Sequence, residues 1–167
     1  VWIDAHPDIT LPGDPYPGYH AMAVTACMGH GDAKIVAELP AAFDPSKILF
    51  VGLRNWERGE IKARQHQYGI KHLTPEEVAA DSDALRAWLK SCGASKVVVH
   101  FDMDVLDPAE IVAAVGTDPD GMKIEAVIRV INDIAAEKEL VGLTVAEPMP
   151  RTAIRLRDML GRLPLLE

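Results

Sequence analysis

The stretch Lys96–Asp104, KVVVHFDMD, decides the fold, because a continuous apolar run ends directly in two aspartates. Such a run between turn residues is typical of a strand buried on both faces of a parallel sheet. Two other stretches have the same design: Val1–Ile3 runs into Asp4–Asp8, DAHPD, and Leu140–Val145 is followed by Glu147. Because the carboxyl ends of parallel strands share one edge of the sheet, we expect five carboxylates and an imidazole to gather there.

The remaining chain alternates between strand and helix patterns. Apolar runs predict a buried strand at Lys47–Leu53 and a short one at Ile70–Leu73. Helices are predicted at His20–Met28, Lys34–Leu39, Glu60–Tyr68, Thr74–Cys92, Ile124–Ile134 and Leu156–Leu163. The helix from Thr74 begins with a capping-box pattern, TPEE. This alternation predicts a three-layer α/β/α domain with a mostly parallel sheet, spanning residues 1–167.

Composition excludes several classes of protein. The chain is 49% hydrophobic and 25% charged, which is ordinary for a globular domain. A net charge of -8 without a basic stripe argues against a nucleic-acid surface, and no apolar run approaches the roughly 18 residues of a membrane span. Cys27 and Cys92 lie in apolar stretches, so we expect free thiols and a cytoplasmic setting.

The first strand is short. Only three residues precede Asp4, whereas strands usually have about 5–6 residues. We therefore expect the chain to begin within a domain and to lack that domain's N-terminal strands.

The residue types at the strand ends predict a metal site. Residues i, i+2 and i+4 of an extended segment point the same way, so Asp4, His6 and Asp8 should converge, as should Asp102 and Asp104. Crowded carboxylates cost several kcal/mol in a pocket unless a cation compensates their charge. Oxygen ligands with one imidazole and no thiolate favour Mn²⁺, and leave Fe²⁺, Co²⁺ and Zn²⁺ open. A capping turn explains either motif alone, but the pair favours metal binding.

These motifs resemble those of the ureohydrolases, a family of arginases, agmatinases, formimidoylglutamases and guanidino-acid hydrolases. Trp2–Ile9, WIDAHPDI, is similar to the family pattern W-[IVL]-D-A-H-x-D-[IL], and His100–Pro108 is similar to S-F-D-[VIL]-D-x-[LF]-D-P. Gly142–Pro150, GLTVAEPMP, resembles G-x-D-[IV]-x-E-x-x-P. Residues 19–32 make the resemblance most arginase-like. It implies the C-terminal portion of a binuclear-metal hydrolase that cleaves a guanidinium group to urea and an amine.

The resemblance also implies roles for individual residues. Two Mn²⁺ ions would be held by Asp4, His6, Asp8, Asp102 and Asp104. Asp8 and His20 would handle protons, and Glu147, Glu57 and Thr117 would contact a small guanidino substrate. Arginine is the first choice of substrate; agmatine and the other family substrates stay open. Relatives of this kind form trimers and hexamers, so we expect a homo-oligomer.

Three departures from the family pattern stand out. The family's upstream G-G-x-H motif, whose histidine binds one metal, does not occur in the chain, which leaves one of the two ions and the activity of this chain in question. The turn Gly116–Gly121, GTDPDG, replaces G-T-P-x-x-G-G. His100 replaces a serine and Thr144 an aspartate. We interpret His100 as a hydrogen-bonded core residue and not as a ligand.

Two alternatives remain from the sequence. Phe101–Leu106, FDMDVL, also resembles the nucleophile motif of haloacid-dehalogenase-type phosphatases, in which Asp102 would be phosphorylated with Mg²⁺ bound. That motif usually opens a chain, and this alternative leaves Asp4, His6 and Asp8 unused. The other alternative is a non-catalytic relative or fragment.

Overall fold

Five parallel strands form the central sheet of the computed structural model, which describes residues 1–150 and 153–166. Their order across the sheet is β3 (Lys71–Leu73), β2 (Leu49–Val51), β1 (Trp2–Ile3), β4 (Lys96–Asp102) and β5 (Glu139–Ala146). The chain runs outward from β1 to β3, then returns to β4 on the other side of β1. The strand order therefore reverses between β1 and β4, and parallel sheets bind ligands at such a reversal.

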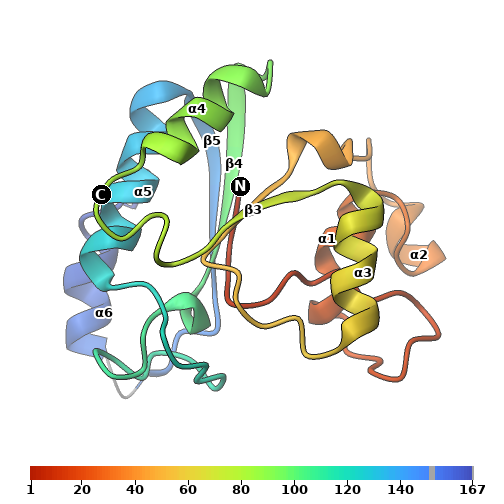
Figure 1. Cartoon of the computed structure of the whole chain (residues 1–167), viewed down its shortest axis with the longest axis horizontal. Coiled ribbons are helices and arrows are strands. Elements are labelled where there is room, and N and C mark those ends of the chain that lie inside the picture. Colours follow the sequence, from red (N-terminus) through yellow and green to blue (C-terminus); the bar gives the residue numbers. More distant parts are fainter. Residues whose placement is uncertain (151–152, 167) are drawn as a thin grey trace.

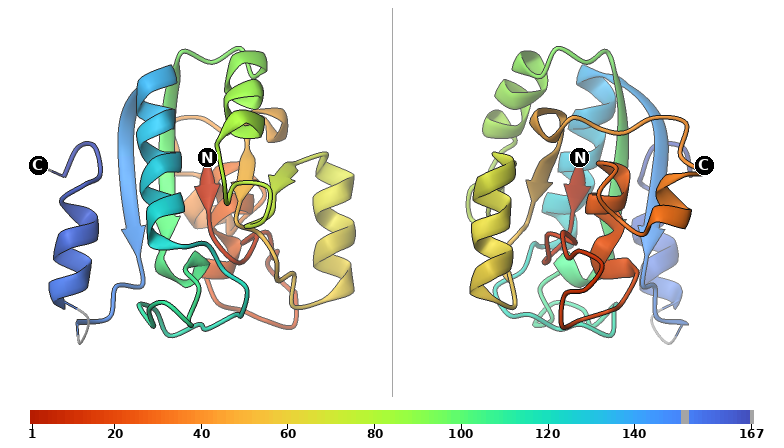
Figure 2. Two further views of the ribbon diagram at one scale, coloured as in Figure 1. Left: turned by 60° about the vertical axis from the view of Figure 1, so that its left-hand side comes forward. Right: turned by 90° about the vertical axis from the view of Figure 1, so that its right-hand side faces the viewer.

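Helices cover both faces of the sheet (Figure 1). One face packs against α4 (Asp83–Ser91), α5 (Ile124–Glu137) and α6 (Ala153–Leu160). The other packs against α1 (Ala23–Cys27) and α3 (Gly59–Tyr68), with α2 (Ala33–Val36) beside α1. Figure 2 shows this division from two further sides. The predicted three-layer α/β/α fold with a mostly parallel sheet is confirmed.

Helix α5 shows how sequence spacing builds the larger core. Val127, Ile131 and Ile134 recur at helical spacing and are completely buried. They join one apolar cluster with Leu85 of α4 and Phe101 of β4. Burying each such side chain stabilises the fold by about 1.5–3 kcal/mol. This cluster fixes β4, and with it the position of the aspartates that follow.

The helix expected to begin at Thr74 begins later. Thr74 and Glu77 do exchange the hydrogen bonds of a capping box, at 2.7 and 3.3 Å, but residues 75–79 form only turns. Arg129 of α5 donates to the carbonyls of Val78 and Ala79, which a continuing helix would have used. A tertiary contact thus overrides the local signal, and α4 starts at Asp83.

Smaller differences occur on the other face. The segment expected as a helix at His20–Met28 begins with a 3-10 turn, His20–Met22, before α1. Helix α2 starts one residue early, because the Asp32 side chain accepts from the Lys34 N–H at 2.9 Å, and it ends at Val36 instead of Leu39. Across the part of the chain that the structure describes, no helix combines the length and apolarity needed to cross a membrane.

Candidate metal centre

The two aspartate motifs leave their strands through the same local geometry. Asp4 Oδ1 accepts from the His6 N–H at 2.6 Å, and Asp102 Oδ1 accepts from the Asp104 N–H at 2.9 Å. A bond from an aspartate to the backbone two residues later is an Asx turn. Asp8 has a φ of 49°, so this segment is not extended either. The prediction that strand alternation aligns these side chains is therefore wrong: turns bring them together.

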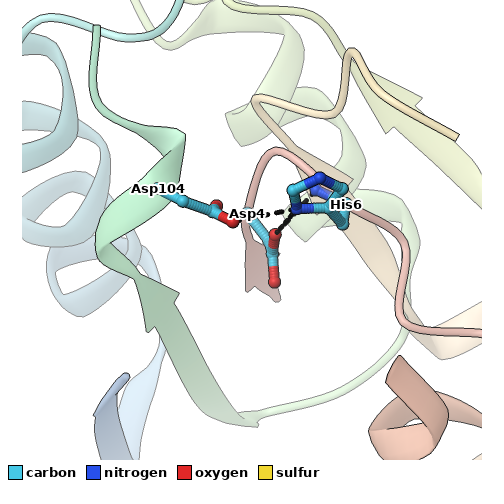
Figure 3. A group of neighbouring side chains, drawn as sticks. All are labelled: Asp4, His6 and Asp104. Atoms are coloured by element: carbon cyan, nitrogen blue, oxygen red, sulfur yellow. Dashed lines mark hydrogen bonds and ion pairs between the residues drawn. The ribbon is translucent and has the colours of Figure 1, made fainter. Parts of the chain in front are cut away.

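Contacts between the segments that follow β1 and β4 complete the cluster (Figure 3). The Ala5 N–H donates to Asp104 Oδ1 at 3.1 Å. His6 Nδ1 lies 2.9 Å from Asp104 Oδ2 and 3.6 Å from Asp4 Oδ1. Residues about 100 positions apart in the chain thus meet where the strand order reverses.

Three groups of side chains could each hold a metal ion. They are Asp4, His6 and Asp104; Asp4, His100 and Asp102; and Asp102, Asp104 and Glu147, with ligand atoms within 4.8 Å of one another in each group. Asp4 and Asp102 share the second group, so a common ion can reach both. The donors are carboxylates and imidazoles without thiolates, a set that fits Mn²⁺ and similar divalent ions.

A cavity of about 460 Å³ opens onto these groups. Eight of the nine site residues predicted from the sequence line it: Asp4, His6, Asp8, His20, Glu57, Asp102, Asp104 and Glu147. Asp8 belongs to none of the three metal groups found among the described residues. Thr117 does not line the cavity, because its turn presents Gly116 to Asp104 and leaves Thr117 exposed. The structure therefore gives no support to a substrate contact by Thr117.

Most of the chain matches one known protein family. The model described as "Arginase family" matches residues 1–158. The chain belongs to the arginase family. The match includes both aspartate motifs, so the phosphatase alternative is not supported.

Individual members of the arginase family resemble the chain over about half of their own length. The arginase of Entamoeba histolytica is 29% identical over 90% of this chain and 52% of its own sequence. An N(omega)-hydroxy-L-arginine amidinohydrolase of Streptomyces lavendulae is 31% identical over 88% of this chain and 50% of its own. The E. histolytica arginase structure with L-ornithine superposes with a TM-score of 0.80 at 23% identity, over 90% of this chain and 52% of that one.

A formimidoylglutamase structure from Bacillus subtilis has the same arginase-family fold. It gives a TM-score of 0.70 at 17% identity, over 90% of this chain and 45% of that one. At such identity the likeness concerns the fold alone.

The charged groups of this arginase-family site are close enough to shift one another's pKa. Burial, reinforced by Asp104, raises the pKa of Asp4 and of Asp102 to about 7. Burial also raises the pKa of Asp8. Although burial opposes it, contact with Asp104 and Asp4 raises the pKa of His6 to about 11. Burial would raise the pKa of Asp104 too, but the hydrogen bond with His6 brings it below its usual value. In the metal-free chain, the positive charge of His6 thus partly compensates the negative charges of the neighbouring aspartates.

The outer side of His6 contacts residues that sequence reasoning missed. His6 Nε2 lies 3.2 Å from Asp118 Oδ2, and the Asn55 side-chain amide donates to Asp118 Oδ1 at 2.7 Å. Metal-binding histidines are commonly oriented by a carboxylate on their second nitrogen. The signal in the sequence was the departure of the Gly116–Gly121 turn from the family pattern, which places an aspartate at this point.

Contrary to the prediction from sequence, His100 does not lie in the core. Its Nδ1 lies 2.8 Å from Thr144 Oγ1, so the expected hydrogen bond is present, but the ring is only partly buried and lines the cavity. Burial lowers the pKa of His100 to about 4, which leaves the imidazole neutral at neutral pH.

Proposed function

We propose that this chain carries the metal-binding portion of a ureohydrolase that hydrolyses the guanidinium group of arginine to urea and ornithine. The observation that carries the proposal is the meeting of the β1 and β4 aspartates with His6 at the reversal of strand order. Membership of the arginase family and the names of the relatives support the reaction class.

The donor set suits two Mn²⁺ ions. Asp4, His6 and Asp104 would hold one ion, and Asp4 and Asp102 would share a second. Bound together, two divalent cations lower the pKa of a water and so supply a nucleophile at neutral pH.

Side chains around the cavity would position the substrate. Glu147 follows β5 and can pair its carboxylate with the planar guanidinium, a geometry that favours two parallel hydrogen bonds. Glu57 lies in the loop after β2, across β1 from Glu147, and would contact the substrate's α-amino group. Because both acids line one cavity, a cationic substrate is favoured over an anionic one.

Proton transfer completes the chemistry. Water adds to the guanidinium carbon, and the C–N bond to the ornithine nitrogen breaks, so the leaving amine must gain a proton. Asp8, whose pKa is raised by burial, would take the proton of the attacking water. His20 lies at the cavity next to Tyr16, whose hydroxyl is 3.1 Å from its Nε2, and would exchange protons with solvent.

Urea release tests the proposal. The full-length protein, loaded with Mn²⁺, should release urea from arginine at least about tenfold faster than from agmatine at equal concentration. Faster release from agmatine would replace the proposed substrate, while the absence of urea from both would favour a non-catalytic relative.

A further inference from the structure

His100 stands two residues before Asp102 on β4, so both side chains point to the same face of the sheet. That face carries the cavity, which both residues line. A ring nitrogen of His100 lies within 4.8 Å of carboxylate oxygens of both Asp4 and Asp102. Among the metal-capable groups of the described residues, it is the only imidazole besides that of His6.

The His100 ring is held in place on two sides. Residues 100 and 144 are register partners on β4 and β5, and His100 Nδ1 contacts Thr144 Oγ1 at 2.8 Å. The Trp2 indole stacks on the imidazole at 3.7 Å between ring centroids, and its Nε1 donates to Asp4 Oδ2 at 3.0 Å. With Nδ1–H donating to the threonine hydroxyl, Nε2 carries the free lone pair. Ligand histidines are commonly oriented by such a bond from the second ring nitrogen.

We propose that His100 Nε2 ligates the second metal ion, together with Asp4 and Asp102, and that Thr144 is the positioning residue for its ring. This inference rests on the proposed function, because it assigns a ligand to the same binuclear centre. It gives each ion one imidazole: His6 for the ion beside Asp104, and His100 for the other. The two residues that depart from the family pattern on β4 and β5 then act as one unit.

The test is metal binding by the chain, measured without reference to activity. Isothermal titration of the metal-free chain with Mn²⁺ should give two ions per chain. His100→Ala should reduce the uptake to one ion, and Thr144→Val should keep both ions but weaken one by about 10–100-fold. His66→Ala, which changes an exposed histidine of α3 that does not line the cavity, is the matched control and should bind like the unchanged chain.

A spectroscopic measurement avoids any variant that fails to fold. In the ¹⁵N-histidine-labelled chain, Cd²⁺ should shift the Nε2 resonance of His100 while its Nδ1 stays protonated. If His6 responds to Cd²⁺ and His100 does not, or if His100→Ala still binds two ions, His100 is no ligand and the proposed function stands. If neither histidine responds and no ion binds, the proposed function fails as well.

Discussion

At the scale of single residues, His6 is surrounded by three carboxylates: Asp4 and Asp104 at Nδ1 and Asp118 at Nε2. When His6 binds an ion through Nδ1, the contact with Asp118 would keep the proton on Nε2. Asp118→Asn removes the charge that holds a proton on Nε2, so Mn²⁺ affinity should fall by about 10–100-fold. Titration calorimetry measures this. Asp120→Asn, in the same turn but away from the cavity, should change nothing, and equal effects of both variants would contradict the assignment.

Glu147 carries the second prediction at this scale. Glu147→Gln keeps the shape of the side chain but removes the charge that would pair with guanidinium. A charge-assisted hydrogen bond contributes about 1.5–3 kcal/mol, so kcat/KM for arginine should fall by about 10–100-fold. Glu139→Gln, at the opposite end of β5, is the control for urea-release assays. An unchanged kcat/KM in Glu147→Gln would remove Glu147 from the substrate site.

The acidic residues of the candidate site could be predicted from the sequence, but their backbone conformation could not. Asp8, Glu57 and Glu147 have φ values of 49°, 57° and 58°, in the left-handed region that non-glycine residues rarely adopt. Strain of this kind gathers at functional sites and is held by the surrounding structure. No local sequence pattern predicts these positive φ values, because a glutamate after a strand is equally compatible with an ordinary surface loop. Asp118 was missed for a similar reason, since its partner lies 112 positions earlier in the chain.

At the scale of elements, Arg54 joins the loops that follow β2 and β4. Its guanidinium donates to the carbonyls of Asp104 and Asp118 at 3.0 and 2.8 Å, and to that of Val105 at 3.2 Å. A lysine cannot reproduce this fork, because its ammonium is a compact point charge. One side chain therefore fixes the positions of the loop that carries Asp104 and of the turn that carries Asp118.

Arg54→Lys should lower the free energy of unfolding by about 2–3 kcal/mol, since several carbonyls lose a charged donor. Denaturant titration measures this. Arg162→Lys alters an exposed ion pair with Glu125, which solvent screens, and should cost much less. Equal losses in the two variants would show that the Arg54 contacts contribute little.

Elements were predictable where their own residues determine them. The apolar stripe of α5 and the apolar runs of β2 and β4 identified those elements correctly. The start of α4 was not predictable, because it depends on Arg129 contacting carbonyls about 50 positions away. The Asx turns at Asp4 and Asp102 escaped prediction because alternation is the simpler expectation for a segment that follows a strand.

At the scale of the whole molecule, the buried charges make stability depend on pH. With pKa values of about 7 for Asp4 and Asp102, the metal-free fold binds more protons than the unfolded chain between about pH 4 and 7. His6, with a pKa of about 11, also keeps a proton in the folded state that the unfolded chain loses above about pH 6.5. His100 and the Val1 amino group, whose pKa values burial lowers to about 4 and about 5, have the opposite effect over part of this range. They are two groups against four, because burial raises the pKa of Asp8 as well as those of Asp4 and Asp102. The free energy of unfolding of the metal-free chain should therefore fall as pH rises from 5 to 8.

Thermal unfolding in the presence of a chelator checks this: Tm should be lower at pH 8 than at pH 5. Saturating Mn²⁺ should reverse the trend, because ligands must lose protons to bind a metal. Carboxylates with a lowered pKa, such as Asp14, titrate below pH 5 and do not affect the stability difference between pH 5 and 8. A metal-free Tm that increases toward pH 8 would contradict the charge assignment.

The shortest strand stands at the middle of the sheet. β1 has only two residues, yet it pairs with β2 on one side and with β4 on the other, at Phe50 and His100 for Trp2. An ion shared by Asp4 and Asp102 would tie β1 to β4 just beyond their last ladder bond. The ion would then stabilise the pairing of β1 with β4. Once the ion is removed by a chelator, the backbone amides of β1 should exchange with solvent long before those of α5. Such an ion would thus also set how often the hydrogen bonds of β1 open.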